Sequence, residues 1–288
     1  MAQGIFVGLC SVEIIYYLPT SLGPSQRMKA ERQIALAGGP ATNAAVTFSA
    51  CGNSATLITG LGEHSLSEVA RSDLREYPIN LIDLTSQPSR PPSLGSVLLD
   101  LSTGNYSVAY SNTDVRKLLP EPLNTKLFYG ANVLMLDGFY LSQAIEAARI
   151  AKELHIPVVF DGGGWKHGMD ELLGLVDYAL CSDKFQIPGC QNKYDLIEAM
   201  HDRGVPHMAI TRAERPIIAS SHGKRFEVPV HQVLTLDTLR AGDILGGAFC
   251  HYITNQGFAT ALEWAAGIAS RSCTSLGPRN WISQIQVI

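Results

Sequence analysis

The sequence predicts an α/β protein with a doubly wound, mostly parallel β-sheet and helices on both of its faces. Short apolar segments alternate with longer segments of helical spacing through most of the 288 residues. Several short segments are apolar throughout, such as Val133-Leu134-Met135-Leu136, as expected of strands buried on both faces. The length and the hydrophobic content of 46% fit a single domain over residues 1–288 with a sizeable core.

The expected strands are runs of β-branched and apolar residues between turn-forming residues. In chain order they cover residues 4–10, 54–59, 79–84, 133–137, 157–161, 178–181 and 208–211. Ligands of such sheets bind at the carboxyl ends of the strands, so functional residues are expected there.

The expected helices are longer segments in which apolar residues recur every three or four positions. In chain order they cover residues 41–51, 66–77, 142–155, 194–203, 243–255 and 259–275. The first of them is rich in small apolar residues and ends before Gly52, a typical C-terminal cap.

Two stretches break the alternation and predict a strand and a hairpin instead of βα units. Residues 13–18 read as a strand, and residues 96–110 as a hairpin with a turn at Ser102-Thr103-Gly104-Asn105. The proline-rich piece 88–92 is expected to lead into this second stretch. We therefore expect a small β lid from two segments, approximately 11–30 and 86–112.

Composition excludes several classes of function. A net charge of −4 gives no reason to expect a nucleic acid as partner, and no apolar run reaches the length of a membrane span. The N-terminus lacks the basic region of a signal peptide. The six cysteines form no Cys-x-x-Cys pair and the eight histidines no zinc pattern, so we expect free thiols in a cytoplasmic protein.

The most informative segment is Asp237-Thr238-Leu239-Arg240-Ala241-Gly242-Asp243, which runs into an apolar helix. The first turn of a helix has unpaired N–H groups and a partial positive charge, so it can hold a phosphate. A carboxylate beside that phosphate, here Asp243, can take a proton from an attacking hydroxyl. The alternative is a structural role, in which the same residues only cap the helix.

A second motif, Gly38-Gly39-Pro40-Ala41-Thr42-Asn43, lies about two hundred residues upstream. Paired glycines let the backbone approach a ligand closely, and the Asn43 amide can both donate to and accept from sugar hydroxyls. The alternative is a tight turn before a buried helix.

Together the two motifs resemble the signatures of the PfkB, or ribokinase-like, carbohydrate kinases, in the family's order and near its two ends. The resemblance covers essentially the whole chain and implies the ribokinase-like fold, in which a β lid covers the sugar site. It also implies ATP and Mg²⁺ as cofactors, leaves a monovalent cation open, and extends to a homodimer formed through the lid.

Residue by residue, the resemblance implies that Asp243 is the catalytic base, and that Ala241 and Gly242 form the anion hole. Gly38, Gly39 and Asn43 match positions that contact the sugar. The family's sugar-binding aspartate is replaced by Glu13, which keeps the charge on a longer side chain. The alternative for Glu13 is a solvated strand residue.

The nucleotide side departs further from the family. Its Asn-x-x-Glu region aligns with Ser182-Asp183-Lys184-Phe185, where Asp183 is left to reach a hydrated metal ion. Its Thr-x-Gly-x-x-Gly loop aligns with Thr211-Arg212-Ala213-Glu214-Arg215-Pro216, without either glycine. The expected nucleotide-binding residues are Ser182, Thr211, Arg212 and Glu214, with Arg212 or Arg215 supplying charge. Alternatively, these arginines are ordinary surface residues.

Arg240 stands where the family signature has glycine. Its guanidinium can bind a phosphate and support catalysis, or fill the space that the γ-phosphate needs.

The sequence predicts an ATP-dependent kinase that phosphorylates a hydroxyl of a small sugar or sugar-like substrate. Two alternatives remain at this stage: a catalytically silent binding or regulatory protein, and a nucleoside kinase that stacks a base on Phe139, Tyr140 or Trp165.

Overall fold

The computed structural model describes residues 1–87, 89–111, 118 and 121–284, and its larger sheet has nine strands. Their spatial order is β13-β12-β11-β10-β9-β8-β1-β4-β5, and the strands from β11 to β5 pair in parallel. The bounds are β1 (Gln3–Val7), β4 (Ser54–Thr59), β5 (Ile79–Asp83), β8 (Val133–Leu136), β9 (Val158–Gly162), β10 (Tyr178–Ser182), β11 (His207–Arg212), β12 (Arg215–Ser221) and β13 (Lys224–Val228).

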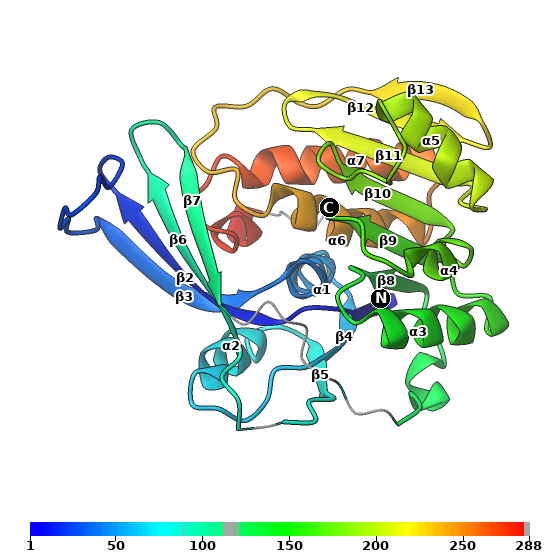
Figure 1. The fold of residues 1–288 in the computed structure, drawn as a ribbon, viewed down its shortest axis with the longest axis horizontal. Coiled ribbons are helices and arrows are strands. Elements are labelled where there is room, and N and C mark those ends of the chain that lie inside the picture. Colours follow the sequence, from blue (N-terminus) through cyan, green and yellow to red (C-terminus); the bar gives the residue numbers. More distant parts are fainter. Residues whose placement is uncertain (88, 112–117, 119–120, 285–288) are drawn as a thin grey trace.

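Helices cover both faces of this sheet, as the sequence predicts (Figure 1). One face carries α1 (Pro40–Ala50), α6 (Ala241–Ile253), α7 (Phe258–Ser272) and the short α2 (Ser67–Leu74). The other face carries α3 (Leu141–Glu153), α4 (Met169–Leu173) and α5 (Lys193–Asp202). Within β1, Phe6 packs into the first layer, whereas Ile5 and Val7 pack into the second. This alternation explains why the central strands are apolar throughout.

The antiparallel edge of the sheet was not among the expected strands. β12 and β13 form a meander with β11. Residues 211–216, the expected nucleotide-binding loop, form the β11–β12 hairpin, in which Arg212 pairs with Arg215. Two 3₁₀ turns, η1 (Thr125–Phe128) and η2 (Asn280–Gln284), also escaped the sequence prediction because they carry no helical periodicity.

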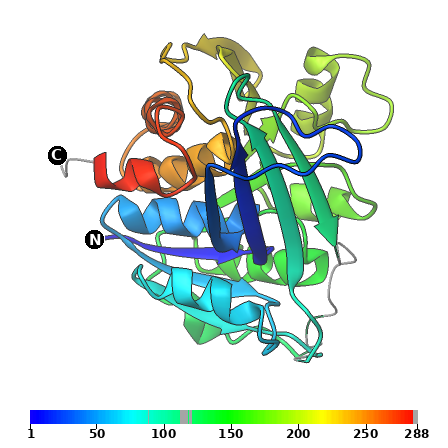
Figure 2. The ribbon, with the colours of Figure 1, turned by 90° about the vertical axis from the view of Figure 1, so that its left-hand side faces the viewer.

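A second sheet of four strands, hereafter the lid, projects from one side of the body (Figure 1), and Figure 2 shows that side facing the viewer. Its order is β3-β2-β6-β7, with bounds β2 (Ser11–Leu18), β3 (Arg32–Gly38), β6 (Ser93–Asp100) and β7 (Tyr106–Ser111). The strand and hairpin expected from the sequence are β2 and β6–β7. β3 lies past the expected first segment, 11–30, and its last residue, Gly38, begins the upstream motif. Of the expected second segment, residues 88 and 112 lie outside the described residues.

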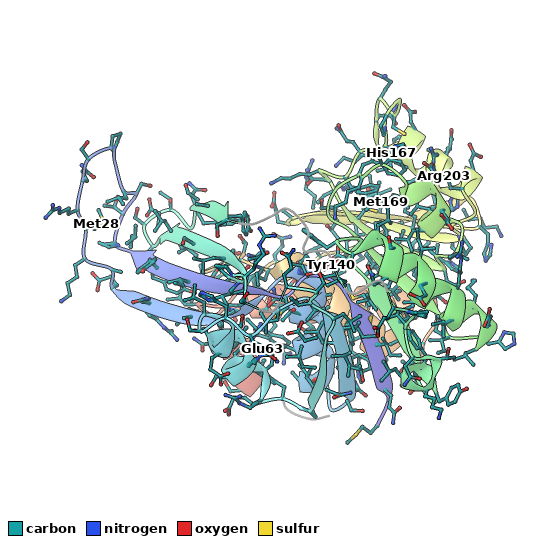
Figure 3. All side chains as sticks on the ribbon, turned by 60° about the horizontal axis from the view of Figure 1, so that its bottom comes forward. Met28, Glu63, Tyr140, His167, Met169 and Arg203 are labelled. Atoms are coloured by element: carbon teal, nitrogen blue, oxygen red, sulfur yellow. The ribbon has the colours of Figure 1, made fainter. Side chains whose placement is uncertain are left out.

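The lid has its own small core, into which two residues of the body pack, the buried Leu239 and the partly buried Leu276. Ile15, Val97 and Leu99 pack together with Leu239, which lies two residues before α6. The segment that opens α6 is therefore held between the lid and the large sheet. At the far end of the lid from Tyr140 lies Met28, on the loop between β2 and β3 (Figure 3).

Close packing of α6 on α1 gives a stability prediction. An added Cβ at Gly247 would lie 2.3 Å from the Ala44 carbonyl oxygen, whereas one at Gly267 in α7 would meet nothing within 4 Å. Gly247→Ala is therefore expected to lower the free energy of unfolding by about 1–3 kcal/mol through overpacking. Gly267→Ala, the matched control, should raise it by about 0.5–1 kcal/mol through helix propensity. Urea unfolding of both variants beside the parent measures this, and equal effects would contradict the packing argument.

Candidate active site

Asp243 lies in the first turn of α6, where the lid meets the carboxyl ends of the parallel strands. The helix begins at Ala241, and the N–H of Ile244 donates to the Arg240 carbonyl at 2.9 Å. Gly242 is exposed in the same turn. The Ala241 N–H donates to the Thr238 carbonyl at 3.2 Å, so the turn itself uses that amide. Of the two expected anion-hole amides, Gly242 is therefore the better placed.

The chain enters α6 through a left-handed residue that is not glycine. Arg240 has φ 68° and ψ 11°. Ala213, where the nucleotide loop of the kinase family has its first glycine, also has a positive φ of 54°. A side chain in this conformation costs roughly 1–2 kcal/mol relative to the right-handed region. Both positions therefore keep a backbone shape suited to glycine although the glycine is gone.

The Arg240 side chain contacts the lid. Its Nη2 and Nε donate to the two carboxylate oxygens of Glu13, the Nε contact at 3.2 Å, and Nη2 also donates to the Tyr110 hydroxyl at 3.3 Å. Glu13 is only 1% exposed, so the interpretation as a solvated residue is wrong. Burial raises the pKa of the Glu13 carboxyl, and the Arg240 charge opposes that rise. The structure thus joins two of the residues at which the sequence departs from the family signatures.

The paired glycines serve packing in the described structure. A Cβ at Gly38 would lie 2.2 Å from Cδ of Glu13, and one at Gly39 2.2 Å from the Leu9 carbonyl oxygen. Gly39 also has φ 103° and precedes α1. Gly38 therefore leaves room for the buried Glu13–Arg240 pair, and a direct role for Gly38 and Gly39 against a sugar remains a prediction.

Asn43 holds the candidate base. Its Nδ2 donates to Oδ2 of Asp243 at 2.8 Å, and its Oδ1 accepts from Nη1 of Arg279 at 2.9 Å. The side chain is fully buried. Protein groups thus contact both ends of the amide, and a direct contact of Asn43 with sugar hydroxyls remains a prediction.

Sequence reasoning missed three functional candidates. Asp161 lies at the carboxyl end of β9, and the strand-end rule would have found it. Arg279 and Tyr110 carry no local signal, because their partners come from distant segments.

Two carboxyls interact closely here. Burial raises the pKa of Asp161 well above its usual value, and the charges of Asp243 and Asp137 raise it further. Burial also raises the pKa of Asp243, whereas the charge of Arg240, the Asn43 hydrogen bond and the charge of Arg279 lower it. The cations and the amide thus favour the ionised form of Asp243, which a general base requires.

The nucleotide-side residues lie at the neighbouring strand ends. Ser182 and Thr211 are register partners on β10 and β11, and the Thr211 hydroxyl donates to the Cys181 carbonyl at 3.4 Å. Glu214 is exposed in the hairpin turn. Arg212 donates to the Pro216 carbonyl and pairs with Glu227 at 2.8 Å. The Arg212 guanidinium is thus bonded to β12 and β13, and its expected role against a nucleotide remains a prediction.

Asp183 follows Ser182 and pairs with two cations, Arg215 at 3.5 Å and Lys193 at 3.8 Å. Within the described ranges, no group of three or more His, Cys, Asp and Glu side chains is arranged to hold a metal ion. Magnesium needs few protein ligands when it arrives on a nucleotide, one or two carboxylates besides phosphates and water. The single carboxylate of Asp183 fits that requirement.

Comparisons with known proteins cover nearly the whole chain. The family model described as "pfkB family carbohydrate kinase" matches residues 1–285. The ribokinase of Haemophilus influenzae is 21% identical over 286 residues, which cover 96% of this chain and 94% of that protein.

Solved structures share the fold at low identity. The Giardia lamblia ribokinase has a TM-score of 0.80 at 15% identity, covering 99% of this chain and 98% of its own. The Arabidopsis thaliana ribokinase, solved with ribose and ATP, has a TM-score of 0.75 at 19% identity, covering 96% and 94%. The ribokinase-like fold expected from the sequence is confirmed. In the part of the chain that the structure describes, no helix has the length and apolar character needed to cross a membrane.

The buried ion pair gives a prediction with an internal control. Arg240→Gly relieves the strain of the left-handed backbone but leaves the buried Glu13 carboxylate without its cation. We therefore expect the free energy of unfolding to fall by about 2–4 kcal/mol near pH 8. The loss should shrink as the pH falls, because Glu13 without its partner takes up a proton in the folded state.

Urea unfolding of a double-mutant cycle tests this prediction. Adding Glu13→Gln to Arg240→Gly should recover part of the lost stability, because no buried charge is then left unpaired. An Arg240→Gly variant as stable as the parent at pH 8 would show that the pair contributes nothing.

Proposed function

The chain belongs to the pfkB family of carbohydrate kinases, a family of phosphotransferases, and from this premise we propose the phosphorylation of a sugar hydroxyl by ATP. The acceptor is a sugar or sugar-like alcohol. The observation that carries the proposal is the Asp243 carboxylate, held by Asn43 in the first turn of α6 beside the exposed Gly242. A base and an anion-binding turn within one helix turn are the two elements that phosphoryl transfer to an alcohol needs.

In the proposed reaction, Asp243 accepts the proton of the acceptor hydroxyl. The hydroxyl oxygen forms a bond to the γ-phosphorus, the bond from that phosphorus to the β,γ-bridging oxygen breaks, and ADP leaves with the bond electrons. The Gly242 amide and the N-terminal partial charge of α6 stabilise the charge on the phosphoryl oxygens. Ala241 contributes less than the sequence suggests, because its N–H is committed to Thr238.

On the acceptor side, the buried Glu13 is out of reach, and the polar groups of the lid junction are Arg240 and Tyr110. We assign recognition of the sugar to these two groups, with Glu13 acting through Arg240. In this proposal Arg240 supports catalysis and does not fill the space that the γ-phosphate needs, because its side chain extends toward the lid. The lid would exclude water, which otherwise competes as acceptor.

On the nucleotide side, Ser182, Thr211 and Glu214 line the strand ends where ATP would bind, and Arg215 supplies the positive charge in place of Arg212. Mg²⁺ bound with ATP would neutralise phosphate charge, and Asp183 is the carboxylate that would hold it through water. A need for a monovalent cation stays open.

Two further proposals concern the whole protein. A homodimer through the lid remains our expectation, and the exposed Tyr106 and Tyr110 on β7 are compatible with it. The free cysteines support the expected cytoplasmic location.

The structure favours neither alternative function. Tyr140 is 3% exposed, Trp165 packs edge-on against Phe185 at 6.4 Å, and Lys166 lies 3.8 Å above the ring of Phe139. These rings are engaged by the protein and leave little for a nucleobase. A catalytically silent binder has no need for a carboxylate oriented by Asn43 and Arg279.

Asp243→Asn tests the proposed function. The change keeps the size of the side chain but removes proton acceptance, so kcat should fall about 10²–10⁴-fold on the best sugar found. Affinity for a non-hydrolysable ATP analogue, measured by calorimetry, should change little. Asp170→Asn, which alters an exposed ion pair with Arg203, is the control and should retain parental turnover. Near-parental kcat for Asp243→Asn would rule out this mechanism.

A further inference from the structure

We propose that Arg279 is a positioning residue for phosphoryl transfer, acting on Asp243 through the amide of Asn43. This inference rests on the proposed function, because it assigns Asp243 the role of base. Arg279 lies in the segment between α7 and η2, far from α6 in the sequence. Neither motif of the sequence includes it.

The relay consists of two hydrogen bonds in series. Nη1 of Arg279 donates to Oδ1 of Asn43 at 2.9 Å, and Nδ2 of Asn43 donates to Oδ2 of Asp243 at 2.8 Å. Asn43 is fully buried, and the Arg279 side chain is 13% exposed. Water therefore has little access to either bond, and the two contacts depend on each other.

Arg279 decides which way the amide of Asn43 points. A guanidinium has donors only, so the group that faces it must be the amide oxygen, and the NH₂ group is turned to Asp243. A carboxylate accepts that bond without loss, whereas a protonated carboxyl oxygen does so poorly. The relay thus favours the ionised base and occupies one of its oxygens. In the proposed reaction the other oxygen, Oδ1, accepts the proton of the acceptor hydroxyl.

Several protein groups hold Arg279 in place. Its Nη2 donates to the Ala37 carbonyl at 2.9 Å and lies 3.3 Å from Oδ2 of Asp73. The chain before it is tied to the turn of α6 by Asp237, whose carboxylate accepts from the N–H of both Leu239 and Gly277 at 2.8 Å. The first residue of the downstream motif therefore joins the relay to the segment that opens α6.

The effect of Arg279 on the pKa of Asp243 depends on the other charges around that carboxyl. Arg240 lowers the pKa of Asp243 more than Arg279 does, but it already pairs with the negative charge of Glu13. Arg279 pairs with Asp73 and still lowers the pKa of Asp243, against the rise caused by burial. Without the Arg279 charge and the fixed amide, Asp243 would keep its proton to a higher pH.

The test is the pH profile of kcat/KM for the parent and for Arg279→Met. We expect the acid limb to move up by about one pH unit, since a nearby opposite charge is worth about that much or more. We also expect kcat to fall at least about 10-fold at its new optimum. Arg279→Gln keeps a donor toward Asn43 without the charge, so its acid limb should move while kcat falls less. Gln is also the variant that carries the test should Met prevent folding.

A matched control separates positioning from stability. Arg71 forms a comparable partly buried ion pair with Asp83 at 2.6 Å, away from Asp243. Arg71→Met should lower the thermal midpoint without moving the acid limb. If Arg279→Met or Arg279→Gln behaves like Arg71→Met, with an unmoved limb, Arg279 is a structural residue only and the proposal is wrong.

A second readout does not depend on activity. Titration of the Asp243 carboxyl by ¹³C NMR, assigned by loss of its signal in Asp243→Asn, should show a higher pKa in Arg279→Gln than in the parent. A parent that phosphorylates no sugar would refute the proposed function, and this titration would still decide on the relay. An unchanged pKa in an active parent would refute the relay alone.

Discussion

A buried ion pair between Arg240 and Glu13 sets how the lid meets the body of the protein. Arg240 precedes α6 and Glu13 lies in β2, so the pair joins the helix that carries Asp243 to the sheet that covers it. Removing two charges from water is unfavourable unless each finds its partner in good geometry. That requirement accounts for the missing side chain at Gly38, the left-handed backbone of Arg240 and its contact with Tyr110.

The same rule of paired charge organises the other side of Asp243. Arg279 and Asp73 bring a second, partly buried ion pair close to the site, and the Asn43 amide links that pair to the base. Asp243 therefore lies between two guanidinium groups that are both engaged elsewhere. Their charges oppose the effect of burial on the pKa of Asp243, and no salt bridge to Asp243 is found among the described residues.

At two departures from the family signatures, the turn keeps its backbone conformation although another residue replaces glycine. Arg240 and Ala213 adopt the positive φ that glycine would take with least strain. Arg240 offsets that cost with the bonds of its side chain to Glu13 and Tyr110. Ala213 sits in a tight hairpin whose flanking residues, Arg212 and Arg215, are paired across the turn. The geometry of the site is thus set by contacts more than by the residue types at the turns.

The sequence by itself determined the parallel sheet, the helices on both faces, the family and the position of Asp243 at a helix start. Those features arise from periodicity and from short motifs, which act over neighbouring residues. It did not determine β3, the β12–β13 meander or the partners of Glu13 and Asn43. These depend on which segments meet in space: Arg240 reaches Glu13, and Arg279 reaches Asn43, across more than two hundred residues of chain. Burial then decides the roles, because a side chain enclosed by protein must bond to protein groups and is withdrawn from the substrate.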